Sequence, residues 1–283
     1  MITIRFWGVR GSIASAGGHT VGVGGNTSCV EVEAGPTRIC FDAGTGLRAF
    51  GTHLGAAPLE LHLLLSHFHW DHIQGFPFFG PAYIPGNKLH VYGPERSVPR
   101  GSDVRGALDA QMRAPHFPVG LEAMRAELDF RALPAGAAFA VGEAMVRTAA
   151  ACHPNGCLAY RIDHGGRSMV YATDTEHDGR TGALDTQLVE LARGADVLIY
   201  DAQYTEAEYH AGKRGWGHST ATEAVRVARA ARVGQLVLFH HDPSRSDEDV
   251  ARIEDETRQL FRLTTAAREG LTITLGDVAE QAA

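Results

Sequence analysis

The stretch of sequence that decides the fold reads Ser66-His67-Phe68-His69-Trp70-Asp71-His72. It continues the apolar run Glu60 to Ser66, which is typical of a buried strand. Side chains two residues apart in an extended segment point to the same side, so His67 and His69 are placed to share one metal ion. Where the chain turns into a helix, Asp71 and His72 are placed to reach a second ion. Imidazoles and carboxylates are the usual ligands of zinc and similar divalent ions, so the stretch predicts a metal centre.

Strand and helix patterns alternate outward from this stretch in both directions. This order favours an α/β protein in which two mixed sheets pack face to face with helices outside, a four-layer αββα sandwich. We expect one domain over residues 1–283, with residues 95–133 as its least regular part and a candidate lid over the site. The expected strands are 1–7, 27–33, 37–42, 60–66, 88–92, 144–151, 168–173, 196–201, 235–240 and 271–275. The expected helices are 102–113, 184–193, 220–232 and 247–263.

The pattern HxHxDH at a strand-to-helix turn resembles the hallmark of the metallo-β-lactamase superfamily. The resemblance implies three further metal ligands, each at the end of a later strand. A histidine corresponds to His153, a bridging aspartate to Asp174, and a last histidine to the pair His240-His241. His240 is the first residue past the apolar run and is our choice, with His241 as the alternative. The implied ligand set is His67, His69, Asp71, His72, His153, Asp174 and His240.

A second motif, Gly217-His218-Ser219-Thr220, starts a predicted helix, and Ser219 or Thr220 is a natural N-cap. Together with the segment from Asp201 onward, it resembles the ribonuclease Z branch and related phosphodiesterases. That resemblance implies that His218 contacts the scissile phosphate and that an upstream acid orients it. We assign the acid to Glu206, with Glu208 as the alternative. The other interpretation is that His218 only helps to begin the helix.

The N-terminal run Trp7 to Ser12 also resembles this branch, and Arg10 is a candidate partner for a phosphate oxygen or part of an ordinary turn. The long arm with which ribonuclease Z grips transfer RNA has no counterpart in the roughly 40 residues between Tyr160 and Asp201. The formal net charge is −7, without a basic cluster, whereas proteins that hold long nucleic acids present a cationic surface. We therefore expect a small phosphodiester, such as a cyclic nucleotide, and not a long nucleic acid as the substrate.

The implied mechanism uses two divalent ions, which we expect to be zinc, with manganese or iron as alternatives. Two ions that share a water lower its pKa and produce a hydroxide that attacks phosphorus. Asp71 is expected to orient that water as well as to bind metal, and His218 to assist at the phosphate. Three other functions are considered: hydrolysis of a thioester, lactone or β-lactam on the same centre, ribonuclease Z-type RNA processing, and a catalytically silent metal-binding module.

The composition of the chain and its N-terminal sequence indicate the location of the protein in the cell. No apolar run reaches 18 residues and the N-terminus lacks a signal-peptide layout, so we expect a cytoplasmic protein that does not bind membranes.

The remaining cysteines and histidines are given no part in the chemistry. The four cysteines form no CxxC pair, and we interpret Cys152 and Cys157, which flank His153, as buried apolar side chains and not as ligands. A homodimer is the default assembly. The scattered histidines, His62 and His90 among them, are assigned to structural or surface roles.

Overall fold

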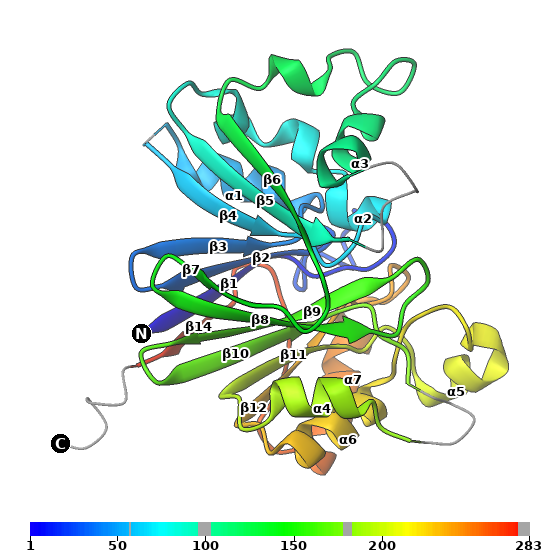
Figure 1. Ribbon diagram of the computed structural model, residues 1–283. Coiled ribbons are helices and arrows are strands. Elements are labelled where there is room, and N and C mark those ends of the chain that lie inside the picture. The colour runs from blue at the N-terminus through cyan, green and yellow to red at the C-terminus, as the bar shows by residue number, and fades with distance from the viewer. Residues whose placement is uncertain (57, 96–102, 178–182, 277–283) are drawn as a thin grey trace.

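Two seven-stranded sheets pack face to face in this computed structural model, with helices on both outer faces (Figure 1), which confirms the predicted four-layer sandwich. The structure describes residues 1–56, 58–95, 103–177 and 183–276. The first sheet has the order β14 (Thr272–Leu275), β1 (Ile2–Gly8), β2 (Cys29–Ala34), β3 (Thr37–Phe41), β4 (Glu60–Leu64), β5 (Lys88–Pro94) and β6 (Glu127–Leu133). The second has the order β13 (Thr264–Ala266), β12 (Gln235–Phe239), β11 (Val197–Asp201), β10 (Arg167–Ala172), β9 (Cys157–His164), β8 (Ala144–Ala151) and β7 (Ala138–Val141).

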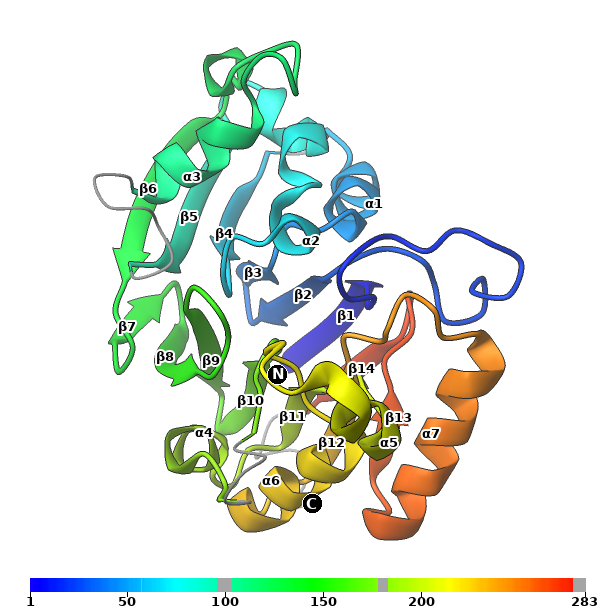
Figure 2. The same cartoon turned by 90° about the vertical axis from the view of Figure 1, so that its right-hand side faces the viewer.

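The helices form the outer layers, one beside each sheet, as the turned view in Figure 2 shows. Beside the first sheet lie α1 (Gly46–Leu54), α2 (Trp70–Ile73) and α3 (Val104–Gln111), with the short helices η1 (Phe76–Phe78), η2 (Gly80–Tyr83) and η3 (Leu121–Ala123). Beside the second lie α4 (Thr186–Ala192), α6 (Ala221–Ala231) and α7 (Asp247–Leu260), with α5 (Glu206–Glu208) and η4 (Tyr209–Lys213) near the sheet end. Thr220 is the N-cap of α6 and accepts a hydrogen bond from the backbone N–H of Glu223, as the sequence predicted.

The core between the sheets is built from alternate residues of the strands. In β1, Ile2, Ile4 and Phe6 are fully buried, and the residues between them are partly exposed. Phe41 of β3 stacks on Tyr171 of β10 with ring centroids 4.8 Å apart, which joins the two sheets. Separate apolar clusters lie under the helices of each outer layer. Three apolar layers therefore fix the sheets relative to each other and to their helices.

Parallel pairing decides where the polar residues of the sequence meet. Strands β3 to β6 are parallel in the first sheet, and β10 to β13 are parallel in the second. Parallel strands end at the same edge of a sheet. Asp42 and Ser66 therefore follow strands at one edge of the first sheet. Asp174, Asp201 and His240 lie at the corresponding ends of β10, β11 and β12 in the second.

One prediction about the fold is wrong. Residues 95–133 were expected to be the least regular part of the chain, apart from a helix at 102–113. That helix is present as α3, but the described part of the segment also contains η3 and the unpredicted strand β6. A role of this segment as a lid stays a prediction. β6 pairs in parallel with β5 over seven residue pairs and is the edge strand of the first sheet. Its charged, partly exposed residues hid a strand whose outer edge faces solvent. Residues 96–102, which include the expected helix start at 102, lie outside the described residues.

No helix in the described part of the chain is long and apolar enough to cross a membrane.

Close backbone contact holds the chain that follows the histidine-rich segment. A Cβ atom added to Gly75 would lie 1.9 Å from the carbonyl oxygen of Gly44, a contact that only backbone movement relieves. We predict that Gly75→Ala lowers the free energy of unfolding by about 3 kcal/mol. Gly80→Ala is the matched control because nothing lies within 4 Å of its added Cβ. Urea denaturation at equal metal saturation tests this, and equal stability of the two variants would contradict it.

Candidate metal centre

The structure gathers the predicted ligands into two adjoining groups at the carboxyl ends of the strands. In each group, one possible ligand atom per residue lies within 4.8 Å of the others. The first group is His67, His69 and His153, and the second is Asp71, His72, Asp174 and His240. His69 and His153 approach through Nδ1 and Nε2, which are 3.0 Å apart. Two sheets and a short helix thus bring together residues up to 173 positions apart in the chain, from His67 to His240.

Asp174 belongs to the second group but faces the first group as well, and its two carboxylate oxygens point to different sets of histidines. Its Oδ2 is 3.5 Å from Nε2 of His67 and 3.7 Å from Nε2 of His153. Its Oδ1 is 3.3 Å from Nε2 of His72 and 3.2 Å from Nε2 of His240. Only 1% of the residue is exposed. A carboxylate placed in this way is suited to bridge two cations.

In three of the rings, the nitrogen that faces away from Asp174 is held by a neighbouring group, which fixes the orientation of the imidazole. Nδ1 of His72 is 2.7 Å from Oδ2 of Asp42, which also accepts a hydrogen bond from the Tyr171 hydroxyl. Nδ1 of His153 is 2.8 Å from the carbonyl oxygen of Gly217. Nδ1 of His240 is 2.9 Å from Oε1 of Gln203. The rings are therefore oriented by the protein itself.

Backbone strain is concentrated at the same place. Asp42, Asp174 and His240, each just past the end of a strand, have φ values of 58°, 50° and 60°. This left-handed region costs a non-glycine residue roughly 1–2 kcal/mol. Ser12, with φ of 63°, donates its backbone N–H to Oδ2 of Asp71 at 2.7 Å. Strained residues of this kind gather at functional sites, where the surrounding structure holds them.

The protonation states of Asp174 and His67 suit metal binding. Burial opposes ionisation of Asp174, but the imidazoles of His240, His72 and His67 lower the pKa of its carboxyl well below the usual range. Burial, with the imidazole of His72 next to it, lowers the pKa of His67 well below its ordinary value. Nε2 of His67 is buried and has no hydrogen-bond partner among the residues that the structure describes. A bare nitrogen lone pair beside a buried carboxylate fits a divalent cation, so the residues present match the group that the family implies.

His218 lies beside both groups of ligands. Its ring stacks on His240 with centroids 4.9 Å apart and lies 5.1 Å from the ring of His153. Its Nδ1 is 2.8 Å from Oδ2 of Asp201, a fully buried carboxylate at the end of β11. Burial disfavours the charged ring, but Asp201 outweighs it and raises the pKa of His218 to about 9. The contact with Asp201 therefore favours the protonated form of the imidazole, whose Nε2–H is a hydrogen-bond donor.

The assignment of Glu206 as the partner of His218 needs correction, and so does the alternative, Glu208. Glu206 accepts a hydrogen bond from the hydroxyl of Thr220 and lies 3.5 Å from Nε2 of His210. Glu208 closes the capping box with Thr205 and pairs with Arg245. Both acids lie in the first turn of α5, where a carboxylate caps the helix. The acid that holds His218 is Asp201 and neither glutamate.

Two further alternatives are distinguished by position. Of the adjacent histidines, His240 points into the second group, whereas Nε2 of His241 lies 3.0 Å from the carbonyl oxygen of Ala267. Arg10 is fully buried and donates to the carbonyl oxygens of Gly24 and Arg245, both at 2.8 Å. Its guanidinium holds loops together through Nε and Nη1, and Nη2 lies 4.0 Å from Oδ1 of Asp247. Because the side chain is fully buried among these groups, it does not face a phosphate in the centre.

The sequence missed the residues that orient the ligands, chiefly Asp42, Gln203 and Asp201. Each follows a strand or ends it, as the ligands do, and this shared position was the available signal. Cys157 is buried and Cys152 is exposed, so the expectation of burial is wrong for Cys152. Neither cysteine belongs to a group of possible metal ligands in the described part of the chain.

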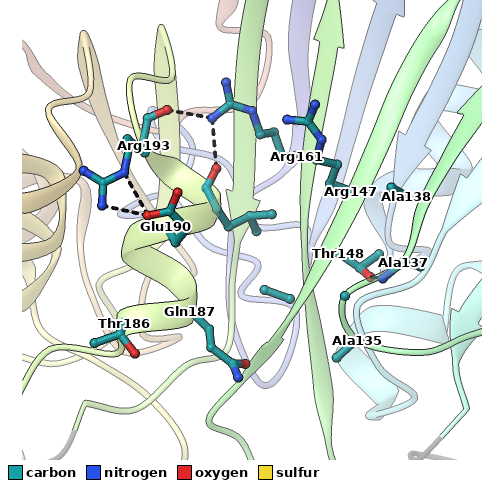
Figure 3. A pocket seen from close by; sticks show the side chains of 13 residues that line it. Ala135, Ala137, Ala138, Arg147, Thr148, Arg161, Thr186, Gln187, Glu190 and Arg193 are labelled. Atoms are coloured by element: carbon teal, nitrogen blue, oxygen red, sulfur yellow. Dashed lines mark hydrogen bonds and ion pairs between the residues drawn. The ribbon is translucent and has the colours of Figure 1, made fainter.

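A groove of about 660 Å³ lies elsewhere, on the outer face of the second sheet beside α4 (Figure 3). Its charged side chains are engaged by neighbouring groups. Arg161 donates to the carbonyl oxygens of Leu191 and Arg193, both at 2.9 Å, and Arg193 pairs with Glu190 at 2.7 Å. None of its lining residues is among the possible metal ligands of the described chain. The chemistry-bearing residues therefore gather at the strand ends and not in this groove.

The placement of Asp174 between the two groups has a measurable consequence. We predict that Asp174→Asn, which removes the charge but keeps the shape, weakens both metal sites, because both lose an anionic ligand. His240→Ala removes a ligand from the second group only and should weaken one site. Metal content after gel filtration, with His116→Ala as a control at an exposed histidine, tests this. Two tightly held ions in Asp174→Asn would contradict a bridging position.

Comparison with known proteins supports the same assignment. Residues 37–241 match the family model of the β-lactamase superfamily domain. An uncharacterized protein of Mycobacterium leprae is 32% identical over 86% of this chain and 81% of its own length. Ribonuclease Z of Archaeoglobus fulgidus is 27% identical over 96% of this chain and 97% of its own.

Solved structures agree on the fold. The metallo-β-lactamase fold protein YhfI of Bacillus subtilis superposes with a TM-score of 0.72 at 18% identity, covering 97% of this chain and 100% of its own. A diphosphatase of the PhnP family gives 0.69 at 18% identity, covering 98% of each chain. The family model covers well over half of the chain, and the chain therefore belongs to the metallo-β-lactamase superfamily of hydrolases.

Proposed function

We propose that this protein hydrolyses small phosphodiesters, such as cyclic nucleotides, with two divalent ions that we take to be zinc. The observation that carries the proposal is the position of His218, a cationic imidazole held by Asp201 beside both groups of metal ligands. Such a group is suited to an anionic substrate whose charge changes during reaction. A neutral ester, thioester or lactam would gain less from a cationic hydrogen-bond donor at this position.

Each group of ligands would hold one of the two ions. The first ion would be held by His67, His69 and His153, and the second by Asp71, His72 and His240. Asp174 would bind both ions. When bound, such ions activate water and stabilise negative charge on the phosphoryl oxygens. Asp71, fixed by the backbone N–H of Ser12, is also placed to orient the attacking water.

His218 acts on the substrate itself. Its protonated ring donates a hydrogen bond to a phosphoryl oxygen and then gives a proton to the leaving oxygen as the ester P–O bond breaks. Water supplies the new oxygen on phosphorus, and Asp201 holds the ring in place throughout. Because Asp201 occupies Nδ1, the proton is delivered from Nε2.

Two exposed tryptophans near this centre favour a nucleotide as the substrate. Trp70 follows His69 directly and is 74% exposed, and Trp216 lies two residues before His218 and is 56% exposed. The ammonium of Lys213 lies 3.9 Å from the centre of the Trp216 ring. Exposed aromatic rings offer stacking surfaces for bases, and a lysine nearby suits an anionic ligand.

A ribonuclease Z-type activity is the second candidate, because the ribonuclease Z of Archaeoglobus fulgidus aligns along nearly the full length of the chain. The net charge of −7 and the short segment between Tyr160 and Asp201 disfavour a long RNA substrate. Salt-sensitive binding of structured RNA would favour this candidate over a small diester.

The first test is hydrolysis of bis(p-nitrophenyl) phosphate, then of cyclic nucleotides, with metal content measured on the same samples. We predict that His218→Ala lowers kcat by about 10²- to 10⁴-fold while both ions stay bound. His210→Ala, at an exposed histidine of the same segment, is the control and should keep full activity.

Three outcomes would count against the proposal. Unchanged turnover in His218→Ala would remove His218 from the reaction. Loss of metal in that variant would make it a structural residue of the centre. Full metal content without phosphodiester turnover, but with cleavage of chromogenic thioesters or lactones, would establish the alternative hydrolase.

A further inference from the structure

Another group of possible metal ligands, outside the hydrolytic centre, lies at the other end of the first sheet. Glu60 and His62 lie on β4, and His90 lies opposite His62 on the parallel strand β5. Glu60 and His62 are two residues apart and share a face of the sheet. Possible ligand atoms, one from each of the three side chains, lie within 4.8 Å of one another. These residues are separate from the centre described above, because His67 follows the carboxyl end of β4 and Glu60 begins the strand.

The contacts within the group are those of a preformed site. The imidazoles of His62 and His90 stack with centroids 4.7 Å apart and planes inclined by 14°. The carboxylate oxygen Oε1 of Glu60 is 3.0 Å from Nε2 of His90. One carboxylate and two imidazoles form a donor set that zinc and similar ions accept.

Each ring also has a supporting partner on its other nitrogen, as metal-binding histidines usually do. Nδ1 of His90 is 3.3 Å from Oδ2 of Asp129, the residue opposite it on β6. Nδ1 of His62 is 3.4 Å from the hydroxyl of Tyr92. Nε2 therefore remains as the coordinating nitrogen of each ring. Asp129 is itself held by Arg131 at 2.6 Å.

The surroundings leave room for an ion and its remaining ligands. A cavity of about 370 Å³ is lined by all three residues, and Glu143 at the turn between β7 and β8 adds another carboxylate to its wall. The nearby cations are engaged, Arg131 by Asp129 and Arg38 by Glu33 at 2.6 Å. The cavity therefore offers space, and because its two lining arginines are paired with other acids, Glu60 and Glu143 remain as its carboxylates.

We propose that Glu60, His62 and His90 bind a divalent transition-metal ion, zinc being the best match, at a site remote from the hydrolytic centre. The lone pairs are available at neutral pH, at least on His62, because burial and then the neighbouring His90 lower the pKa of His62 to about 4. An ion here would join β4 to β5 and stabilise the folded chain by mass action. The inference does not depend on which bond the hydrolytic centre cleaves.

The test is the number of zinc ions per chain after equilibrium dialysis of the full-length protein against zinc. We expect about three ions in the unmodified protein and about two in His62→Gln/His90→Gln, because only the remote site is lost. His116→Gln, at an exposed histidine outside both sites, is the control and should keep all of them. Circular dichroism shows whether the double variant is folded.

Glu60→Gln provides a second measurement if the double variant fails to fold, because the Glu60 side chain is 62% exposed and its replacement cannot disturb the core. It should weaken the additional zinc-binding step in a calorimetric titration by about 10-fold or more. Equal zinc content in the unmodified protein and a folded double variant would overturn the proposal, as would an unchanged titration of Glu60→Gln. The three residues would then form only an ion-pair network, with His90 between Glu60 and Asp129. Neither readout uses hydrolysis, so a failure of the proposed function would be seen separately.

Discussion

Asp174 carries a carboxylate that is almost fully withdrawn from water at the point where the two sheets end together. A charge in such a place is costly unless other groups compensate for it. Here the compensation comes from imidazoles on both sides, His67 and His153 at one oxygen, His72 and His240 at the other. Those imidazoles are held in turn by Asp42, Gln203 and the backbone of Gly217. Both sheets, the turn into α2 and the strain at three strand ends can be understood as the support of this one buried anion.

The same arrangement links architecture to chemistry. Parallel strands bring the ends of β10, β11 and β12 together, and these ends supply Asp174, Asp201 and His240 in one row. Asp201 holds His218 beside the predicted metal ligands and favours its protonated form, so a hydrogen-bond donor lies next to the groups that could hold metal. A site with this combination suits an anionic ester. The exposed rings of Trp70 and Trp216 nearby suit a flat, aromatic portion of that substrate.

Local sequence patterns predicted much of the fold and of the candidate metal centre. The clustering of the predicted ligands in the run from His67 to His72 follows from spacing alone, because a strand and then a helix turn fix where neighbouring side chains point. The distant ligands required the family resemblance. What failed were contacts that depend on strand order. Asp201 approaches His218 because β11 lies between β10 and β12, which no local pattern shows, and nearby Glu206 was chosen in its place. Likewise β6 looked irregular because it is an edge strand, and Arg10 looked available although folding buries it completely.

The position of Asp174 between the other predicted ligands leads us to expect that its carboxylate bridges two divalent ions. The most direct measurement is anomalous X-ray scattering from crystals of the zinc-loaded protein, recorded on both sides of the zinc absorption edge. We expect two strong peaks in the hydrolytic centre, one among His67, His69 and His153 and one among Asp71, His72 and His240, with Asp174 bound to both. A single peak there, or two peaks of which only one contacts Asp174, would contradict it.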